Sequence, residues 1–302
     1  MTEKKYCDGL ILKGIDGFYY VETPGGVFEC HARGIFRRRG MTPLAGDHVR
    51  IYASDDGTGS VEEILPRRNS LSRPPVANID QLIIVVSTCE PVPNTLVTDS
   101  IIAEAEASGI EPVIIVSKID LKPAGGLSEI YGKAGIKFFC ASSLSGYGVA
   151  EAEKILPGKV TAFTGNSGVG KSTLLNNMYK QFHLKTAEIS RKLGRGKHTT
   201  RQVELLKLHD GGYVVDTPGF SALDMDFFHA VNIGNLPRCF REFIPYLGKC
   251  RFTSCSHTCE KGCAVLQAVK DGKISRSRHE SYIEIYRGLK EKKAWQKKEK
   301  SV

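Results

Sequence analysis

The sequence GNSGVGKS, residues 165–172, lies near the middle of a 302-residue chain and decides its fold. It matches the motif G-x-x-x-x-G-K-[ST], in which glycines let successive backbone N–H groups point at a β-phosphate. The motif requires a strand before it and a helix after it, as the apolar run 160–163 and the helix-like run 172–178 provide. Lys171 would neutralise the β- and γ-phosphates, and the Ser172 hydroxyl would bind Mg²⁺. The nucleotide-contacting residues predicted from this stretch are Gly165, Asn166, Ser167, Gly168, Val169, Gly170, Lys171, Ser172 and Thr173.

A second motif, Ser117-Lys118-Ile119-Asp120, follows the apolar run 113–116 and is predicted to bind the base of the nucleotide. A carboxylate accepts two hydrogen bonds from guanine, at N1–H and at the exocyclic amine, and adenine has no such donor pair. Asp120 therefore specifies guanine, while the stem of Lys118 would lie along the base. Such motifs usually begin with Asn. The shorter Ser117 side chain reaches the purine less well, so a lower affinity for guanine is expected. The loop predicted to support the base consists of Ala141, Ser142 and Ser143.

The order of these motifs is the reverse of that in ordinary GTPases, because the base motif precedes the phosphate motif. This order indicates a circularly permuted GTPase. Permutation is physically allowed, since the termini of compact domains tend to lie close together. Continuous apolar runs such as 82–86 and 113–116 predict a mostly parallel sheet with helices on both faces, and residues 97–108, closed by Gly109, predict one of the helices.

The sequence DTPG, residues 216–219, is predicted to lie on the magnesium side of the site. Asp216 would hold the metal ion through water, and the Gly219 N–H would sense the γ-phosphate. The next residue is Phe220, not the glutamine that commonly orients the attacking water, so slow intrinsic hydrolysis is expected.

A basic, glycine-containing stretch at 194–201 separates this element from the phosphate motif. Either Thr199 or Thr200 would close onto Mg²⁺ in the triphosphate state. The residues predicted to act in hydrolysis are Lys171, Ser172, Thr199, Thr200, Asp216 and Gly219.

Three domains are predicted: an N-terminal OB-type β-barrel at 1–72, the circularly permuted P-loop GTPase domain at 73–222, and a helical zinc-binding domain at 223–302. The barrel is predicted from short apolar segments separated by turn residues, at 10–12, 18–21, 27–30, 49–51 and 61–64. Residues 69–75 are expected to be a linker. A face for nucleic acid is expected where one such element carries Arg33, Arg37, Arg38 and Arg39.

A cluster of thiols and one imidazole in the last domain predicts a metal site. Its candidate ligands are Cys250, Cys255, His257, Cys259 and Cys263. These groups suit tetrahedral Zn²⁺, and four protein ligands would leave no open position, so the role would be structural. Spacing alone does not decide which of the five is left out.

The charge of the chain is unevenly distributed. The total is +9, yet residues 270–300 hold eleven basic against five acidic residues, and residues 74–156 hold five basic against ten acidic residues. This asymmetry indicates a polyanionic partner bound by some parts of the chain. The apolar stripe formed by Tyr282, Ile285, Tyr286 and Leu289 predicts a packed last helix, and the lysines beyond it are expected to fray.

The composition is that of an ordinary soluble protein, with 41% apolar and 25% charged residues. No apolar run is long enough to span a bilayer, and the N-terminus has no signal-peptide pattern. A cytoplasmic location without a membrane partner is expected, and nine cysteines there favour metal binding over disulfides.

Taken together, these motifs resemble the RsgA (YjeQ/YloQ) family of circularly permuted, small-ribosomal-subunit-dependent GTPases. The resemblance extends over essentially the whole chain, including HTT at 198–200 and DTPGF at 216–220. The family pattern C-x4-C-x-H-x5-C matches Cys250, Cys255, His257 and Cys263, which leaves Cys259 out. The resemblance implies a late assembly factor of the 30S subunit that binds 16S rRNA near the decoding region. It also implies GTP hydrolysis that is stimulated by the subunit and triggers release. In addition, we expect a monomer that binds GTP and GDP, carries one structural Zn²⁺ and uses Mg²⁺ with GTP.

Two other readings use the same residues. In one, the chain is a regulatory GTPase switch with a non-ribosomal protein partner, and the basic tail is merely solvated. In the other, it is a nucleic-acid-binding protein whose nucleotide site is only structural.

Overall fold

The computed structural model describes residues 5–72, 74–179, 203–216 and 230–299. The chain forms two compact units and passes back and forth between them. The first unit consists of residues 1–82, 153–163 and 185–220, and the second of residues 83–152, 164–184 and 221–302. Domain boundaries at residues 72 and 222 stay a prediction. Within the ranges that the structure describes, no helix is long and apolar enough to cross a bilayer.

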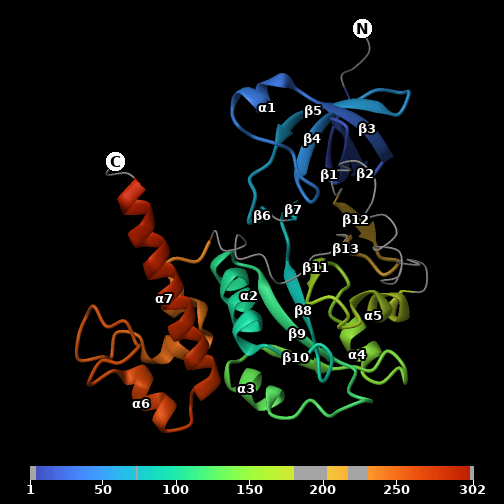
Figure 1. The fold of residues 1–302 in the computed structure, drawn as a ribbon. Coiled ribbons are helices and arrows are strands. Elements are labelled where there is room, and N and C mark those ends of the chain that lie inside the picture. Colours follow the sequence, from blue (N-terminus) through green and yellow to red (C-terminus); the bar gives the residue numbers. More distant parts are fainter. Residues whose placement is uncertain (1–4, 73, 180–202, 217–229, 300–302) are drawn as a thin grey trace. The chain divides into compact units, whose positions relative to one another are not determined.

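A closed five-stranded barrel begins the first unit (blue in Figure 1). Its strands are β1 (Tyr6–Ile15), β2 (Phe18–Thr23), β3 (Gly26–Ala32), β4 (His48–Ala53) and β5 (Thr58–Ile64). β3 and β5 pair in parallel and the other neighbours pair antiparallel, and β4 closes the barrel by pairing with both β5 and β1. The interior is filled by Ile11, Val21, Cys30, Phe36, Val49, Ile51, Val61 and Ile64. The predicted OB-type barrel is confirmed.

The basic residues of the barrel lie on and beside a short helix, α1 (Gly34–Arg38), rather than on a strand. The buried Phe36 side chain anchors this helix in the barrel core, while Arg37 and Arg38 are exposed. Arg33, just before the helix, forms an ion pair with Glu62 at 2.6 Å. The basic face is therefore a helical one.

The stretch 69–75 is expected to be a linker, but residues 70–72 and 75 instead belong to a two-stranded antiparallel sheet made of β6 (Ser70–Ser72) and β7 (Pro75–Ala77). The side chain of Asn69 fastens this hairpin, because it accepts a hydrogen bond from the Ile79 N–H at 2.9 Å and donates one to the Ile79 carbonyl at 2.8 Å. Asn78 in turn donates to the Gly46 carbonyl at 2.9 Å. The exit from the barrel is thus a fixed element.

Three further strands complete the first unit: β11 (Val160–Thr164), β12 (Glu204–Lys207) and β13 (Tyr213–Asp216). β13 pairs in parallel with β11 and antiparallel with β12, and β12 pairs with β1 of the barrel. An ion pair between Lys13 and Glu204, at 2.8 Å, spans the last junction. Glu22 of β2 also accepts hydrogen bonds from Lys207, at 2.7 Å, and from the Tyr213 hydroxyl.

The second unit contains β9 and β10, which pair in parallel, most of β8 beside β9, and the surrounding helices. Its first elements are β8 (Gln81–Ser87), α2 (Thr95–Ala107), β9 (Glu111–Ser117), α3 (Leu127–Lys133), β10 (Lys137–Cys140), α4 (Val149–Glu153) and α5 (Lys171–Met178). β8 is buried along its whole length, as its continuous apolar run predicts. Helix α2 forms where the sequence predicts a helix, because Asn94 caps its N-terminus and Gly109, with φ +69°, follows its end.

The C-terminal part of this unit has its own apolar core. Its elements are η3 (Leu236–Cys239), η4 (Arg241–Tyr246), α6 (Ala264–Lys270) and α7 (Arg276–Glu299). Phe240, Phe243 and Tyr282 are fully buried here, and Tyr286 and Leu289 of the predicted stripe pack against the same core. Helix α7 continues to Glu299 (Figure 1), so the expected fraying of the lysine-rich end was wrong.

Arg278 of α7 is completely buried and joins three elements of the second unit. Its Nη1 lies 2.8 Å from Asp99 Oδ1 on α2, and its Nε lies 2.7 Å from Glu242 Oε1 on η4. The ring of Phe240 faces the guanidinium at 4.4 Å. Burial opposes the charge on Arg278, but the two carboxylates outweigh burial and raise the pKa of the guanidinium. Because a buried charge without its partners is costly, this arrangement fixes α7 against α2 and η4.

Replacing Arg278 with Met is expected to lower the free energy of unfolding by about 3–5 kcal/mol, because Asp99 and Glu242 would stay buried without their partner. The matched control is Arg276→Ala, on the same helix, whose side chain is 86% exposed. That change is expected to cost less than about 0.5 kcal/mol. Urea denaturation measures both values, and equal stability of the two variants would contradict the expectation.

Candidate nucleotide site and metal centre

The phosphate loop, residues 165–170, connects the end of β11 to the start of α5. Gly165, Gly168 and Gly170 have φ of +145°, +83° and +91°, which only glycine adopts without strain. A Cβ on Gly165 would lie 2.3 Å from the Val85 carbonyl oxygen. The glycines of the motif are therefore required by the conformation of the loop.

Lys171, the first residue of α5, reaches back across the phosphate loop. Its Nζ donates to the carbonyls of Gly165, at 2.5 Å, and Asn166, at 3.0 Å. Burial lowers the pKa of Lys171. An anion in the loop would offset this effect, so the ammonium group is placed to bind phosphate oxygens. Ser172 is half-buried in the first turn of α5, and Thr173 is exposed.

Ser117 ends β9 and connects the base motif to the phosphate loop. Its hydroxyl lies 2.6 Å from the Val169 carbonyl and 3.3 Å from the Val86 carbonyl. Lys118 has φ +58°, and its ammonium group donates to the Glu90 carbonyl at 2.6 Å. Ile119 is half-buried and Asp120 is exposed. The turn therefore starts from a buried anchor and ends in an accessible carboxylate.

The predicted base-supporting loop, Ala141 to Ser143, follows β10. Ala141 and Ser142 are buried, and the Ser142 hydroxyl accepts a hydrogen bond from the Ser145 N–H at 3.2 Å. Asn177 of α5 donates to the Ser143 carbonyl at 2.5 Å. Sequence reasoning missed Asn177, because nothing in its local pattern distinguishes it from other polar residues of the helix. The structure thus brings the phosphate loop, the base motif and this loop together within the second unit.

The magnesium-side residues are only partly described. Asp216 is the last residue of β13, at a strand end as predicted, and belongs to the first unit. Thr199, Thr200 and Gly219 lie outside the described residues. Their roles stay predictions.

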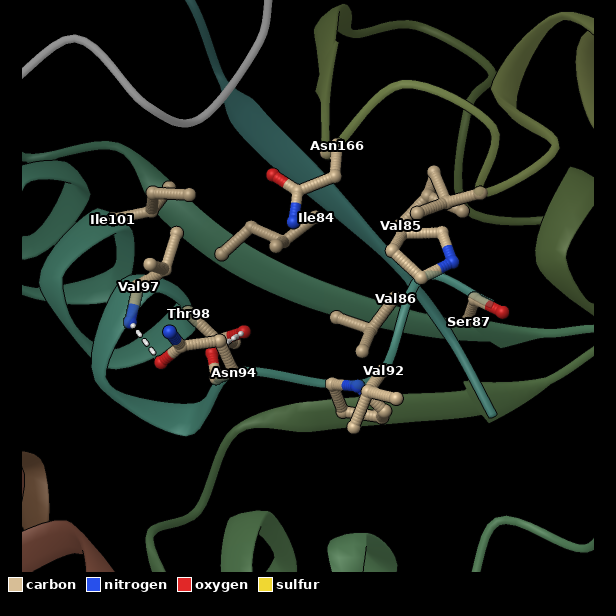
Figure 2. Close-up of a pocket in the computed structure, with 14 residues that line it drawn as sticks. Ile84, Val85, Val86, Ser87, Val92, Asn94, Val97, Thr98, Ile101 and Asn166 are labelled. Carbon is tan, nitrogen blue, oxygen red and sulfur yellow. Dashed lines mark hydrogen bonds between the residues drawn. The ribbon is translucent and has the colours of Figure 1, made fainter. Parts of the chain in front are cut away.

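A pocket lies beside the phosphate loop, between β8 and α2 (Figure 2). Its walls are mainly apolar, with Ile84, Val97 and Ile101 among them. Asn166 projects into this region, and its Oδ1 is buried without a hydrogen-bond partner among the described residues. Gly165, Asn166 and Val169 of the phosphate loop line this pocket, whereas Asp120 and Lys171 do not.

The four residues Cys250, Cys255, His257 and Cys263 form a compact cluster, with all ligand atoms within 4.8 Å of one another. His257 Nδ1 lies 3.5 Å from the Sγ atoms of Cys250 and Cys263, which are 3.9 Å apart. Ligands of a tetrahedral ion at the usual bond lengths of about 2.0–2.3 Å lie about 3.3–3.8 Å apart. The spacing therefore fits one four-coordinate metal ion. Cys259 is exposed and is not part of the cluster.

Groups around the cluster orient its ligands. The backbone N–H groups of Ala264 and Leu266 donate to the sulfurs of Cys250, at 3.3 Å, and Cys263, at 3.5 Å, which favours thiolates. The ring of His279 donates to the His257 carbonyl at 2.8 Å. The backbone donors were not predicted, because every residue except proline has a backbone N–H group and the sequence does not show which ones face the ligands.

Glu260 fixes the loop between the ligands. Its carboxylate accepts hydrogen bonds from the N–H groups of Ser256, at 2.7 Å, and Thr258, at 3.1 Å. Although burial alone would raise it, hydrogen bonds from the Ser256 hydroxyl and from the backbone N–H groups of Ser256 and Cys259 lower the pKa of Glu260 to about 2. The carboxylate therefore stays ionised and holds the loop.

The chain is similar to known proteins over most of its length. The profile of the RsgA GTPase family matches residues 64–226, and that of the RsgA N-terminal domain matches residues 8–61. A protein of Caldanaerobacter subterraneus subsp. tengcongensis named small ribosomal subunit biogenesis GTPase RsgA is 46% identical, over 94% of this chain and 96% of its own. The chain belongs to the RsgA family.

Other relatives match nearly the whole chain. A Ruminiclostridium cellulolyticum protein with the same name is 44% identical over 94% of both chains. The crystal structure of YjeQ from Thermotoga maritima has a TM-score of 0.80 at 32% identity, covering 94% of this chain and 99% of that one. The structure of YloQ, described as a circularly permuted GTPase, has a TM-score of 0.79 at 33% identity, covering 97% and 98%. The predicted fold, including the permuted GTPase domain, is confirmed.

For this member of the RsgA family, Cys263→Ser is expected to abolish metal binding at the cluster and lower the melting temperature. The sulfur of Cys263 contacts the other ligands and caps α6. Cys259→Ser is the matched control, since this exposed thiol lies outside the cluster, and it should retain the metal. Metal analysis of the purified variants measures the difference. Equal metal loss from both would refute the assignment.

Proposed function

We propose that this protein is a GTP hydrolase that acts in the maturation of the small ribosomal subunit. One observation carries the proposal: a glycine-rich phosphate loop and a base motif ending in an exposed aspartate are joined by the Ser117–Val169 hydrogen bond, in a chain of the RsgA family. The names of its relatives support the ribosomal role.

Binding of GTP follows from the chemistry of the loops. Asp120 accepts the two donors on the Watson–Crick edge of guanine, which distinguishes GTP from ATP. The loop N–H groups and Lys171 bind the β- and γ-phosphates. Ala141, Ser142 and Ser143 support the base, and Asn177 holds their loop against α5.

Hydrolysis needs a bound Mg²⁺, which neutralises charge on the phosphates. Ser172, half-buried at the start of α5, and Asp216, at the end of β13, are oxygen donors of the kind that Mg²⁺ takes. Thr199 or Thr200 senses the triphosphate state, as does the N–H of Gly219. With Phe220 in place of the usual glutamine, the small subunit or its rRNA completes the site and stimulates hydrolysis, which then releases the protein.

Contact with 16S rRNA in the 30S subunit uses exposed basic residues. Arg37 and Arg38 on α1 are such residues on the barrel, and α7 continues as a basic helix. The Cys250–Cys255–His257–Cys263 cluster holds one structural Zn²⁺. We propose that the protein works as a monomer in the cytoplasm.

The loop chemistry predicts the effect of removing Lys171. Lys171→Ala is expected to lower kcat/KM for GTP hydrolysis about 100- to 1000-fold, because one charge-stabilising contact to the phosphates is lost. Lys154→Ala is the control, since Lys154 is an exposed lysine outside the predicted site, and it should keep activity within a few-fold. Steady-state hydrolysis of GTP measures both variants, with ATP as the negative control. Unchanged turnover in the Lys171 variant would indicate that the nucleotide site is only structural.

The ribosomal role predicts that purified 30S subunits stimulate GTP hydrolysis and that binding to them weakens steeply with salt, because phosphate contacts release counterions. Reversing the charges of Arg37 and Arg38 to Glu should weaken 30S binding about tenfold or more. The charge-matched control is the pair Lys133→Glu and Lys154→Glu, both exposed residues. Equal hydrolysis with and without 30S would instead favour a regulatory GTPase with a non-ribosomal protein partner.

A further inference from the structure

Ser117 stands where base motifs of this kind usually carry Asn, and the structure shows what its hydroxyl does. Ser117 is only 3% exposed at the end of β9. Its Oγ lies 2.6 Å from the carbonyl oxygen of Val169, near the C-terminal end of the phosphate loop, and 3.3 Å from that of Val86. The base motif is therefore tied directly to the backbone that surrounds the β-phosphate.

A serine hydroxyl has one proton to donate. Both neighbours of Ser117 Oγ are carbonyl oxygens, which only accept, and the shorter contact has the length of a strong O–H···O hydrogen bond. The proton is thus used within the protein. A carboxamide at this position has two N–H donors and can bind a carbonyl and a ring nitrogen of the base at once, whereas the hydroxyl cannot.

The anchored carbonyl belongs to a residue that is itself fixed. The Val169 side chain is 3% exposed, and it lies between Gly168 and Gly170, whose φ values are +83° and +91°. A loop with such glycines has many accessible conformations when it is unrestrained. The Ser117 hydrogen bond holds the Val169 carbonyl within this loop.

Resting on the proposed function, we infer that Ser117 is a positioning residue that holds the phosphate loop and does not contact the base. Guanine is then recognised only at its Watson–Crick edge, by Asp120, and N7 on the opposite edge receives no donor from position 117. The protein accepts guanine nucleotides whose N7 has been replaced by carbon as readily as ordinary ones.

The test compares the affinities of the full-length protein for GDP and 7-deaza-GDP by titration calorimetry. For the wild type we expect two values within about twofold of each other. Ser117→Asn restores the second donor, so it should bind GDP several-fold more tightly than 7-deaza-GDP, as expected for one added hydrogen bond. The ratio of the wild-type affinities for GDP and 7-deaza-GDP can be measured without any variant. The inference can therefore be tested even if a variant does not fold.

Two further variants separate positioning from a general effect on stability. Ser117→Ala should weaken both nucleotides equally, by about two- to tenfold, because the phosphate loop loses its anchor. Ser117→Thr keeps the hydroxyl and should restore both affinities. A wild-type preference of about tenfold or more for GDP over 7-deaza-GDP would overturn the inference and leave the proposed function standing. A wild type that binds neither GDP nor GTP would overturn the proposed function and the inference with it.

Discussion

The carboxylates of α2 hold the second unit together. Asp99 binds the buried guanidinium of Arg278, and Glu104 accepts hydrogen bonds from the N–H groups of Ala230, at 2.9 Å, and Val231, at 3.2 Å. Glu106 forms an ion pair with Arg241, at the start of η4. The helix that packs beside the nucleotide-binding strands therefore also carries the C-terminal part with its metal cluster. The C-terminal part cannot change its position on α2 without leaving a buried charge unpaired.

These ion pairs give the uneven distribution of charge along the chain a second cause besides binding of a polyanion. From the sequence, the acidic excess of residues 74–156 indicates a part of the chain that does not bind the polyanion, yet some of these carboxylates neutralise arginines of the C-terminal part. Arg241 and Arg278 are consequently used inside the protein and are not available to RNA. The basic residues that remain to attract a polyanion are exposed ones such as Arg37 and Arg38. Counting every basic residue in the sequence therefore overestimates the number that can contact RNA.

The sequence predicts features that depend on local spacing. The phosphate motif, the base motif and the cysteine–histidine pattern each require a few residues at fixed separations, and the structure has the corresponding loops. Contacts between residues distant in the sequence were not predictable. Arg278 is 179 residues from Asp99 and 36 from Glu242. Because it lies in a basic segment, the local sequence does not distinguish it from a solvent-exposed arginine. Residues 69–75 were expected to be a linker for a related reason, since their hairpin is stabilised by Asn69 and Ile79 across the turn.

The junction between the barrel and β12 has a consequence for protein engineering. β1 pairs with β12, and Glu22 accepts hydrogen bonds from both Lys207 and Tyr213. The barrel therefore cannot be replaced independently of β12 and β13. A chimera that joined a foreign barrel at residue 72 would lose the partners of Lys207, Tyr213 and Glu204 together. Recombination between distant relatives would have to transfer the strand pair β12–β13 along with the barrel, although some 130 residues of sequence separate them.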